Sequence, residues 1–202
     1  MASLFRCAVV QAYSWTLHLL RQPIYALRHC NVAWTSRVER GAVLVHTIVG
    51  AYTYIAAGVF LNRTHIGNYC SIASGSKIGG MEHPWRSGST STRLSRHQIV
   101  ERETLIEEDV WVGSNVVIRQ GLHVGRGAVI GAGSVVLENV PGYTIVAGVP
   151  AREIRKRFTG EIIQQIAVTK FWEYPPDKAR SLLETIEFPN VQVRQIRTRI
   201  KP

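Results

Sequence analysis

Aliphatic residues recur at every sixth position through most of residues 32–141. The step is clearest where Ile118, Val124, Ile130 and Val136 follow Val112. The same step, interrupted by single steps of five, runs through Val32, Val38, Leu44, Val49, Ile55, Leu61, Ile66, Ile72 and Ile78. An α-helix would need apolar residues at a spacing of 3.6, and an isolated strand would need alternation over a few residues. The period of six therefore indicates a stacked repeat.

Six residues suffice for a short strand and a turn, so three units close a triangular coil of about 18 residues. Coils stack at the strand spacing of roughly 4.8 Å, and about five coils would form a prism about 24 Å tall. Small or medium residues stand two positions before the aliphatics, as Cys70, Ser76 and Ala128 do. Gly113 and Gly125 follow aliphatics, where a turn needs positive φ or close chain approach. The pattern predicts a mainly β fold, a parallel β-helix whose open ends are capped.

The period disappears in one long excursion and ends before the C-terminus. Residues 80–104 are rich in Ser, Thr and Arg, and long excursions from a regular scaffold tend to carry function. Residues 151–158 are expected to form a basic helical segment, and residues 160–187 two helices separated by Pro175-Pro176. We therefore expect an N-terminal, helical segment at 1–31, a β-helix at 32–150 with an inserted loop at 80–104, and a helical extension at 151–202.

Composition adds a strong positive charge to this picture. The 202 residues include 24 Lys and Arg against 14 Asp and Glu, a formal net charge of +10. This surplus favours anionic partners, although a basic surface with no special partner would have the same composition. With 46% hydrophobic residues the chain has enough apolar material for a core, which excludes disorder. No recognised nucleic-acid-binding module accompanies the charge.

Three cysteines, Cys7, Cys30 and Cys70, are too few and too scattered for a disulfide framework or a zinc site, so we expect a reducing, cytoplasmic setting. The uncharged stretch 7–20 is too short to span a bilayer. A packing helix, a membrane-surface helix and a secretion signal are all open interpretations of it. The second would give residues 1–30 a weak association with a membrane surface.

Several motifs resemble those of the hexapeptide-repeat acyltransferases. They occur in order along residues 47–187, at residues 66–73, His83-Pro84, residues 109–114, residues 129–136 and residues 146–152. Residues 158–163 and 170–175 are similar to the C-terminal helices of the xenobiotic acetyltransferase branch. The resemblance implies a left-handed β-helix, a homotrimer with active sites between adjacent prisms, and acetyl-CoA as the acyl donor. It implies no metal.

The resemblance also places the catalytic base at His83. Transfer from a thioester needs an activated nucleophile more than help for the leaving group, and histidine in general is neutral yet basic near pH 7. Glu82 adjoins His83 as a candidate for orienting the ring, although the branch commonly has Asn there. His97 shares the excursion and is a candidate for contact with the acceptor, whereas His123 is expected to face outward from the repeat.

The same resemblance implies a set of acetyl-CoA contacts: Trp111, Gly113, Ser114, Ala132, Arg152 and Arg155. Trp111 would lie beside the coenzyme arm, and Ser114 would stabilise the oxyanion. Gly113 and Ala132 would let the pantetheine pass, while Arg152 and Arg155 would grip phosphates. At Leu137-Glu138 related enzymes often carry Thr-Lys, so an acid replaces one expected coenzyme contact.

The leading hypothesis is acetyl-CoA-dependent O-acetylation of a sugar-type acceptor, either a surface glycan or its precursor. O-acetylation of an antibiotic of the chloramphenicol or streptogramin type is the nearest alternative, because branch membership does not set the acceptor. A non-catalytic β-helix scaffold is a third interpretation. A zinc hydrolase of the carbonic anhydrase type would need three converging histidines, and the sequence does not supply them at coil spacing.

Overall fold

A computed structural model of the chain describes residues 16, 19–95 and 99–188. The chain forms two compact units, residues 1–157 and residues 158–202. The first unit is the β-helix with its excursion, and the second is helical. The fold class predicted from the period of six, a left-handed parallel β-helix with C-terminal helices, is confirmed.

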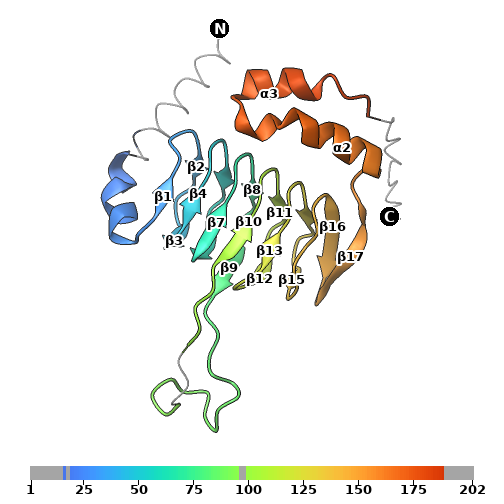
Figure 1. Cartoon of the computed structure of the whole chain (residues 1–202). Coiled ribbons are helices and arrows are strands. Elements are labelled where there is room, and N and C mark those ends of the chain that lie inside the picture. The colour runs from blue at the N-terminus through green and yellow to red at the C-terminus, as the bar shows by residue number, and fades with distance from the viewer. Residues whose placement is uncertain (1–15, 17–18, 96–98, 189–202) are drawn as a thin grey trace, which may run out of the picture. The chain divides into compact units, whose positions relative to one another are not determined.

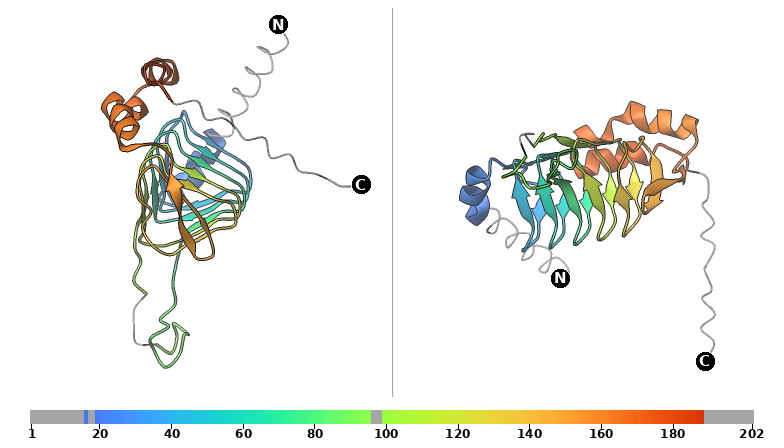
Figure 2. Two further views of the ribbon diagram at one scale, coloured as in Figure 1. Left: turned by 90° about the vertical axis from the view of Figure 1, so that its right-hand side faces the viewer. Right: turned by 90° about the horizontal axis from the view of Figure 1, so that it is seen from below.

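Three sheets form the sides of the β-helix, and each complete coil contributes one parallel strand to each sheet (Figures 1 and 2). Sheet A contains β1 (Asn31–Val32), β4 (Ile48–Val49), β7 (Thr64–Ile66), β10 (Thr104–Ile106) and β13 (His123–Val124). Sheet B contains β2 (Arg37–Val38), β5 (Tyr54–Ile55), β8 (Ser71–Ile72), β11 (Trp111–Val112), β14 (Val129–Ile130), β16 (Thr144–Gly148) and β17 (Ala151–Lys156). Sheet C contains β3 (Val43–Val45), β6 (Phe60–Asn62), β9 (Lys77–Gly80), β12 (Val117–Arg119) and β15 (Val135–Val136).

The aliphatics of the six-residue series form the core. Ile55, Ile72, Val112 and Ile130 pair in register from coil to coil on sheet B, and all are at most 1% exposed. The smaller residues two positions earlier, such as Cys70 and Ala128, are buried with them. Because the inward side chains stack directly on one another, each coil supplies the apolar surface that its neighbours need.

Segments at both ends of the stack cover its open edges. Residues 19–27 are helical, Tyr25 joins the core cluster, and Arg21 Nη1 donates to the carbonyl of Val38 at 2.5 Å. At the other end β17 pairs antiparallel with β16. Within the described part of the chain, no helix is both long and apolar enough to cross a membrane.

The expected basic helix at residues 151–158 is wrong, because residues 151–156 form strand β17. The chain turns back at Gly148, which has a φ of +102°, and β17 then pairs with the last parallel strand. Without β17, the backbone N–H and C=O groups along that edge of β16 would lack partners. The clustered basic residues suggested a basic helical segment, but pairing with the exposed sheet edge outweighed that local preference.

Arg157 anchors the end of β17 to the β-helix. Its Nη1 lies 3.0 Å from Asp109 Oδ2 and donates to the carbonyl of Gly127 at 2.6 Å. Burial raises the pKa of Asp109, and the Arg157 guanidinium opposes that shift. A Cβ on Gly127 would lie 2.6 Å from the Tyr143 ring and 3.1 Å from the guanidinium, so glycine leaves the space that both side chains occupy.

The second unit contains α2 (Gly160–Thr169), the 3-10 helix η1 (Phe171–Glu173) and α3 (Pro176–Leu183). Thr159 caps α2 by accepting from the backbone N–H of Ile162, and Pro176 begins α3, where a missing N–H costs nothing. The two helices predicted on either side of Pro175-Pro176 are therefore confirmed.

Candidate active site

The excursion leaves the β-helix where it was expected, between the end of β9 at Gly80 and the start of β10 at Thr104 (Figure 1). It therefore emerges at the corner between sheets C and A. His83 lies three residues into the excursion and is exposed. Its side chain is held by one hydrogen bond, because Nδ1 lies 3.0 Å from the backbone carbonyl oxygen of Thr90.

This hydrogen bond decides which nitrogen of His83 can act as a base. A carbonyl oxygen only accepts, so the Nδ1 atom beside it must carry the proton. The neutral ring then has an unprotonated Nε2, whose lone pair is free to take a proton from a hydroxyl. The arrangement suits a general base that works through Nε2.

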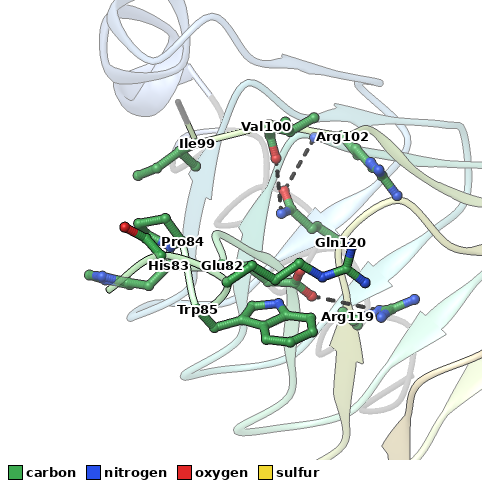
Figure 3. A pocket seen from close by; sticks show the side chains of 11 residues that line it. Glu82, His83, Pro84, Trp85, Ile99, Val100, Arg102, Arg119 and Gln120 are labelled. Carbon is green, nitrogen blue, oxygen red and sulfur yellow. Dashed lines mark hydrogen bonds and ion pairs between the residues drawn. The ribbon is translucent and has the colours of Figure 1, made fainter. Parts of the chain in front are cut away.

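A cavity of about 350 Å³ adjoins His83. Both arms of the excursion and the end of β12 line it (Figure 3). The lining residues are Glu82, His83, Pro84, Trp85, Arg86, Ser87, Ile99, Val100, Arg102, Arg119 and Gln120. A volume of this size lies at the small end of ligand pockets, about 300–1,000 Å³. The cavity places an acceptor-sized space next to the candidate base.

Polar contacts tie the arms of the excursion to the β-helix. Glu82 Oε1 lies 3.6 Å from Arg119 Nε at the end of β12. Gln120 Nε2 donates to the carbonyl of Val100, and Gln120 Oε1 accepts from the backbone N–H of Arg102. These contacts anchor the walls of the cavity to the coils.

The hypothesis that Glu82 orients the His83 ring does not hold, since the Glu82 carboxylate pairs with Arg119 and the Thr90 carbonyl contacts the imidazole. A backbone carbonyl leaves no side-chain signal, which explains why sequence reasoning missed Thr90. His97 lies outside the described residues. His123 is exposed, as expected, and contacts Glu107 Oε1 at 3.0 Å.

The candidate coenzyme residues gather on sheet B and at the corner between sheets B and C. Trp111 lies on β11 with 56% of its surface exposed. Ser114 follows in the turn after β11, and Ala132 occupies the turn after β14, one coil further on. The two turns are joined, because the carbonyl of Ser114 accepts from the backbone N–H of Gly133 at 2.8 Å. Ser114 and Ala132 are therefore neighbours in space.

The packing of the coils explains why residue 113 is glycine without invoking a ligand. It is buried, and a Cβ there would lie 2.6 Å from the backbone N of Ala132 in the next coil. Backbone atoms cannot yield as a flexible side chain can, so the coil spacing itself requires glycine at this position.

Arg152 and Arg155 are exposed on β17, opposite Ala147 and Ile145 of β16. Arg152 Nη1 lies 3.9 Å from Glu138 Oε1, so the acid that replaces the expected lysine faces one of the proposed phosphate contacts. Both side chains of this pair are well exposed, so solvent screens the interaction.

A single chain does not bring the two groups of site residues together. His83 lies beyond the last residue of β9, whereas Ser114 lies before the first residue of β12, and both strands belong to sheet C. The width of sheet C therefore separates the candidate base from the candidate coenzyme residues. Sequence reasoning named both groups, and the topology places them at different corners of the coil.

Within the described residues, no three His, Cys, Asp or Glu side chains are close enough together to hold a metal ion.

The family profile described as bacterial transferase hexapeptide (six repeats) matches residues 103–138. Among solved structures, the chain is similar to a hexapeptide-repeat acetyltransferase from Vibrio cholerae, solved with acetyl coenzyme A. The identity is 28% and the TM-score 0.56, over 67% of this chain and 76% of the other. None of the curated proteins matches the sequence.

A maltose O-acetyltransferase from Clostridium difficile is 25% identical, with a TM-score of 0.50 over 64% of this chain and 67% of the other. An N-acyltransferase from Bacillus cereus, solved with dTDP and 3-hydroxybutyryl-CoA, is 16% identical. Its TM-score is 0.55 over 76% of this chain and 97% of the other, a likeness that extends to the fold alone.

Proposed function

The chain belongs to the hexapeptide-repeat transferase superfamily, and on that premise we propose that it moves an acetyl group from acetyl-CoA to a hydroxyl of a sugar-type acceptor. The observation that carries the proposal is the His83 imidazole, held by the Thr90 carbonyl and directed by its tautomer to act through Nε2 beside a cavity. The similarity to an acetyltransferase solved with acetyl coenzyme A and to a maltose O-acetyltransferase supports this choice of donor and acceptor.

The proposed mechanism follows from the chemistry of a thioester donor. Acetyl-CoA supplies an activated acetyl group whose thiolate leaves readily. His83 Nε2 takes the proton of the acceptor hydroxyl as its oxygen attacks the acetyl carbonyl, so that a C–O bond forms and a C–S bond breaks. The imidazolium then returns the proton to the departing thiolate. Thr90 keeps Nδ1 protonated throughout, which fixes the ring for both transfers.

The donor is proposed to lie along sheet B and the turns that follow it. Ala132 is exposed and carries no side chain beyond Cβ, which leaves room for an extended pantetheine arm. Gly113 keeps the two turns in close contact, Trp111 offers an exposed indole beside this path, and the Ser114 hydroxyl is proposed to donate to the oxyanion. Arg152 and Arg155 are proposed to hold phosphates, with Glu138 weakening the Arg152 contact.

We further propose that the active enzyme is a homotrimer. His83 and Ser114 lie at different corners of the coil, so one chain alone does not complete the site. A neighbouring copy that presents its own B–C corner to His83 would complete it, and three such contacts close a ring.

The proposal is tested by following thiol release from acetyl-CoA in the presence of a panel of sugars and antibiotics. We expect saturable turnover with a sugar, and a loss of about 10²–10⁴-fold in kcat for His83→Ala. His123→Ala is the matched control, because it removes another exposed histidine, one on β13 that does not line the cavity, and should leave turnover unchanged.

Three results would contradict the proposal or part of it. Turnover that survives in His83→Ala would remove the assigned base. A wild-type protein that fails to bind acetyl-CoA in calorimetry would favour the scaffold interpretation. Turnover confined to chloramphenicol or a streptogramin would assign the acceptor to the antibiotic class instead.

A further inference from the structure

The cavity beside His83 has an excess of positive charge. Its lining includes the guanidinium groups of Arg86, Arg102 and Arg119, and within the described part of the chain Glu82 is the one carboxylate among its lining residues. Glu82 pairs with Arg119, which leaves two further arginines on the cavity wall (Figure 3). A neutral acceptor gives no physical reason for this concentration of cations.

Arg102 is held in place by the coils below it. A Cβ on Gly121 would lie 2.9 Å from both Cβ and Cδ of Arg102, so the arginine stem rests on the backbone of that glycine. The backbone N–H of Arg102 donates to Gln120 Oε1, and the Gln120 side chain is buried. These contacts hold the backbone and the first part of the side chain of Arg102 in place, so less conformational freedom is lost when its guanidinium binds a ligand.

Arg102 also forms no ion pair with any other described residue. Arg63, which lies between β6 and β7, pairs with Glu101. His65 on β7 lies 3.8 Å from Glu103, so the acids on either side of Arg102 in the sequence contact other groups. A guanidinium presents a planar set of donors that matches carboxylate and phosphoryl oxygens. Arg102 is therefore available for an anionic group of the acceptor.

Trp85 supplies an apolar wall in the same cavity. Its side chain is 67% exposed, and the Arg86 guanidinium lies 4.8 Å from the ring centroid. The C–H groups on one face of a sugar ring form an apolar surface that packs on an indole. An exposed indole in the same cavity as the Arg102 guanidinium, which forms no ion pair with a described residue, suits a ligand that combines a sugar ring with a negative charge.

We infer that this cavity is the acceptor site and that it selects a saccharide bearing a carboxylate or phosphoryl group, with Arg102 as the main anion contact. The inference rests on the proposed function, since the hydroxyl presented to His83 belongs to that same sugar. Its new content is the charge of the acceptor and the residue that recognises it.

The test compares sugars that share the same ring and differ at C6, where one member of each pair carries an anionic group. The pairs are glucose with glucuronic acid, galactose with galacturonic acid, and glucose with glucose 6-phosphate, assayed for binding to the full-length protein without donor and then for thiol release with acetyl-CoA. Because a hydrogen bond to a charged group is stronger than a neutral one, we expect the charged member of at least one pair to bind about 10–100-fold more tightly. The two kinds of charged sugar distinguish a carboxylate from a phosphoryl ligand.

Arg102→Gln should lower the preference for the charged sugar about tenfold and leave the neutral member unchanged. Arg93→Gln is the matched control, because Arg93 is an exposed arginine of the same excursion that does not line the cavity. The inference is overturned if no pair shows a preference for charge, or if Arg102→Gln behaves like Arg93→Gln.

Binding measured without donor separates this inference from the proposed function. A protein that prefers charged sugars but does not bind acetyl-CoA would support the inference and overturn the transferase proposal. A protein that acetylates neutral and charged sugars equally would do the reverse.

Discussion

At the scale of single residues, small polar side chains on the inner rows of the β-helix satisfy their hydrogen bonds on the next coil. Ser36 Oγ donates to the carbonyl of Gly50, and Thr53 Oγ1 donates to the carbonyl of Gly67. Cys70 occupies the next step of the same row, with Sγ 3.0 Å from the carbonyl oxygen of Glu107. Its thiol therefore stands where the other coils have a hydroxyl.

The Cys70 thiol should be unreactive in the folded protein. Burial raises the pKa of its thiol from 9.0 to about 12, so the thiolate that reacts with labelling reagents is absent at pH 8. We expect a disulfide reagent to modify Cys70 only after denaturant is added, as peptide mapping would show. Labelling of Cys70 in the native protein at the rate of an unhindered thiol would contradict its burial.

The raised pKa of Cys70 also makes a prediction about alkaline pH. The folded state holds this proton more tightly than the unfolded state, so the stabilisation is complete below pH 9 and is lost as pH rises toward 12. Urea unfolding between pH 8 and pH 11 should show a smaller loss of stability for Cys70→Ser than for wild type. Serine should be accepted, because Ser36 makes the equivalent bond two coils earlier in the same row.

At the scale of the elements, the coils approach so closely at the turns that glycine is required. A Cβ on Gly67 would lie 2.7 Å from the backbone N of Glu108, and a Cβ on Gly125 would lie 2.5 Å from that of Gly142. Positive φ is a separate feature of the turns, and many residues that adopt it are not glycine. Tyr52 and Tyr69 are examples, and their stacked rings have centroids 4.9 Å apart. Glycine is therefore required where neighbouring coils approach closely, even at positions where φ is not positive.

Gly67→Ala should destabilise the β-helix by about 1–3 kcal/mol, because the added methyl group meets backbone that belongs to the next coil. Gly80→Ala is the control, since a Cβ there would meet nothing within 4 Å, and its effect should stay within about 0.5 kcal/mol. Urea unfolding monitored by circular dichroism measures both. Equal stability of the two variants would show that the coils can separate at low cost.

At the scale of the whole molecule, the two parts of the candidate site lie at different corners of one chain. The site as proposed would need the C–A corner of one copy and the B–C corner of another. The proposed trimer would contain three identical sites of this kind, each shared between two copies.

Complementation between inactive variants tests this sharing. His83→Ala removes the proposed base, and Ala132→Trp should block the proposed donor path with a bulky side chain at an exposed position. If each site takes one part from each of two copies, trimers assembled from equal amounts of the two variants should regain about a quarter of wild-type activity. Co-expressed variants that stay inactive, while sedimentation shows mixed trimers, would place the whole site within one chain.

The repeat predicted the β-helix and its excursion, and the separate pattern of residues 160–187, divided by Pro175-Pro176, predicted the helices there. The reason is that a coil packs against its neighbours through the same few inward positions, so Ile72, Val112 and Ile130 leave a regular trace in the sequence. His83, Trp111 and Ser114 were also identified from the sequence, because local motifs carry them.

Other features depended on groups that meet only when the chain is folded. Residues 151–156 became a strand because β16 exposed an edge, and no local pattern records that edge. The Thr90 carbonyl at His83, the Gly121 backbone beneath Arg102 and the pairing of Glu82 with Arg119 likewise join residues whose spacing follows no repeat. The inward-facing core residues recur periodically along the chain, so the sequence alone predicts them. The contacts of the excursion depend on where its two arms meet the coils, and only the tertiary structure determines that.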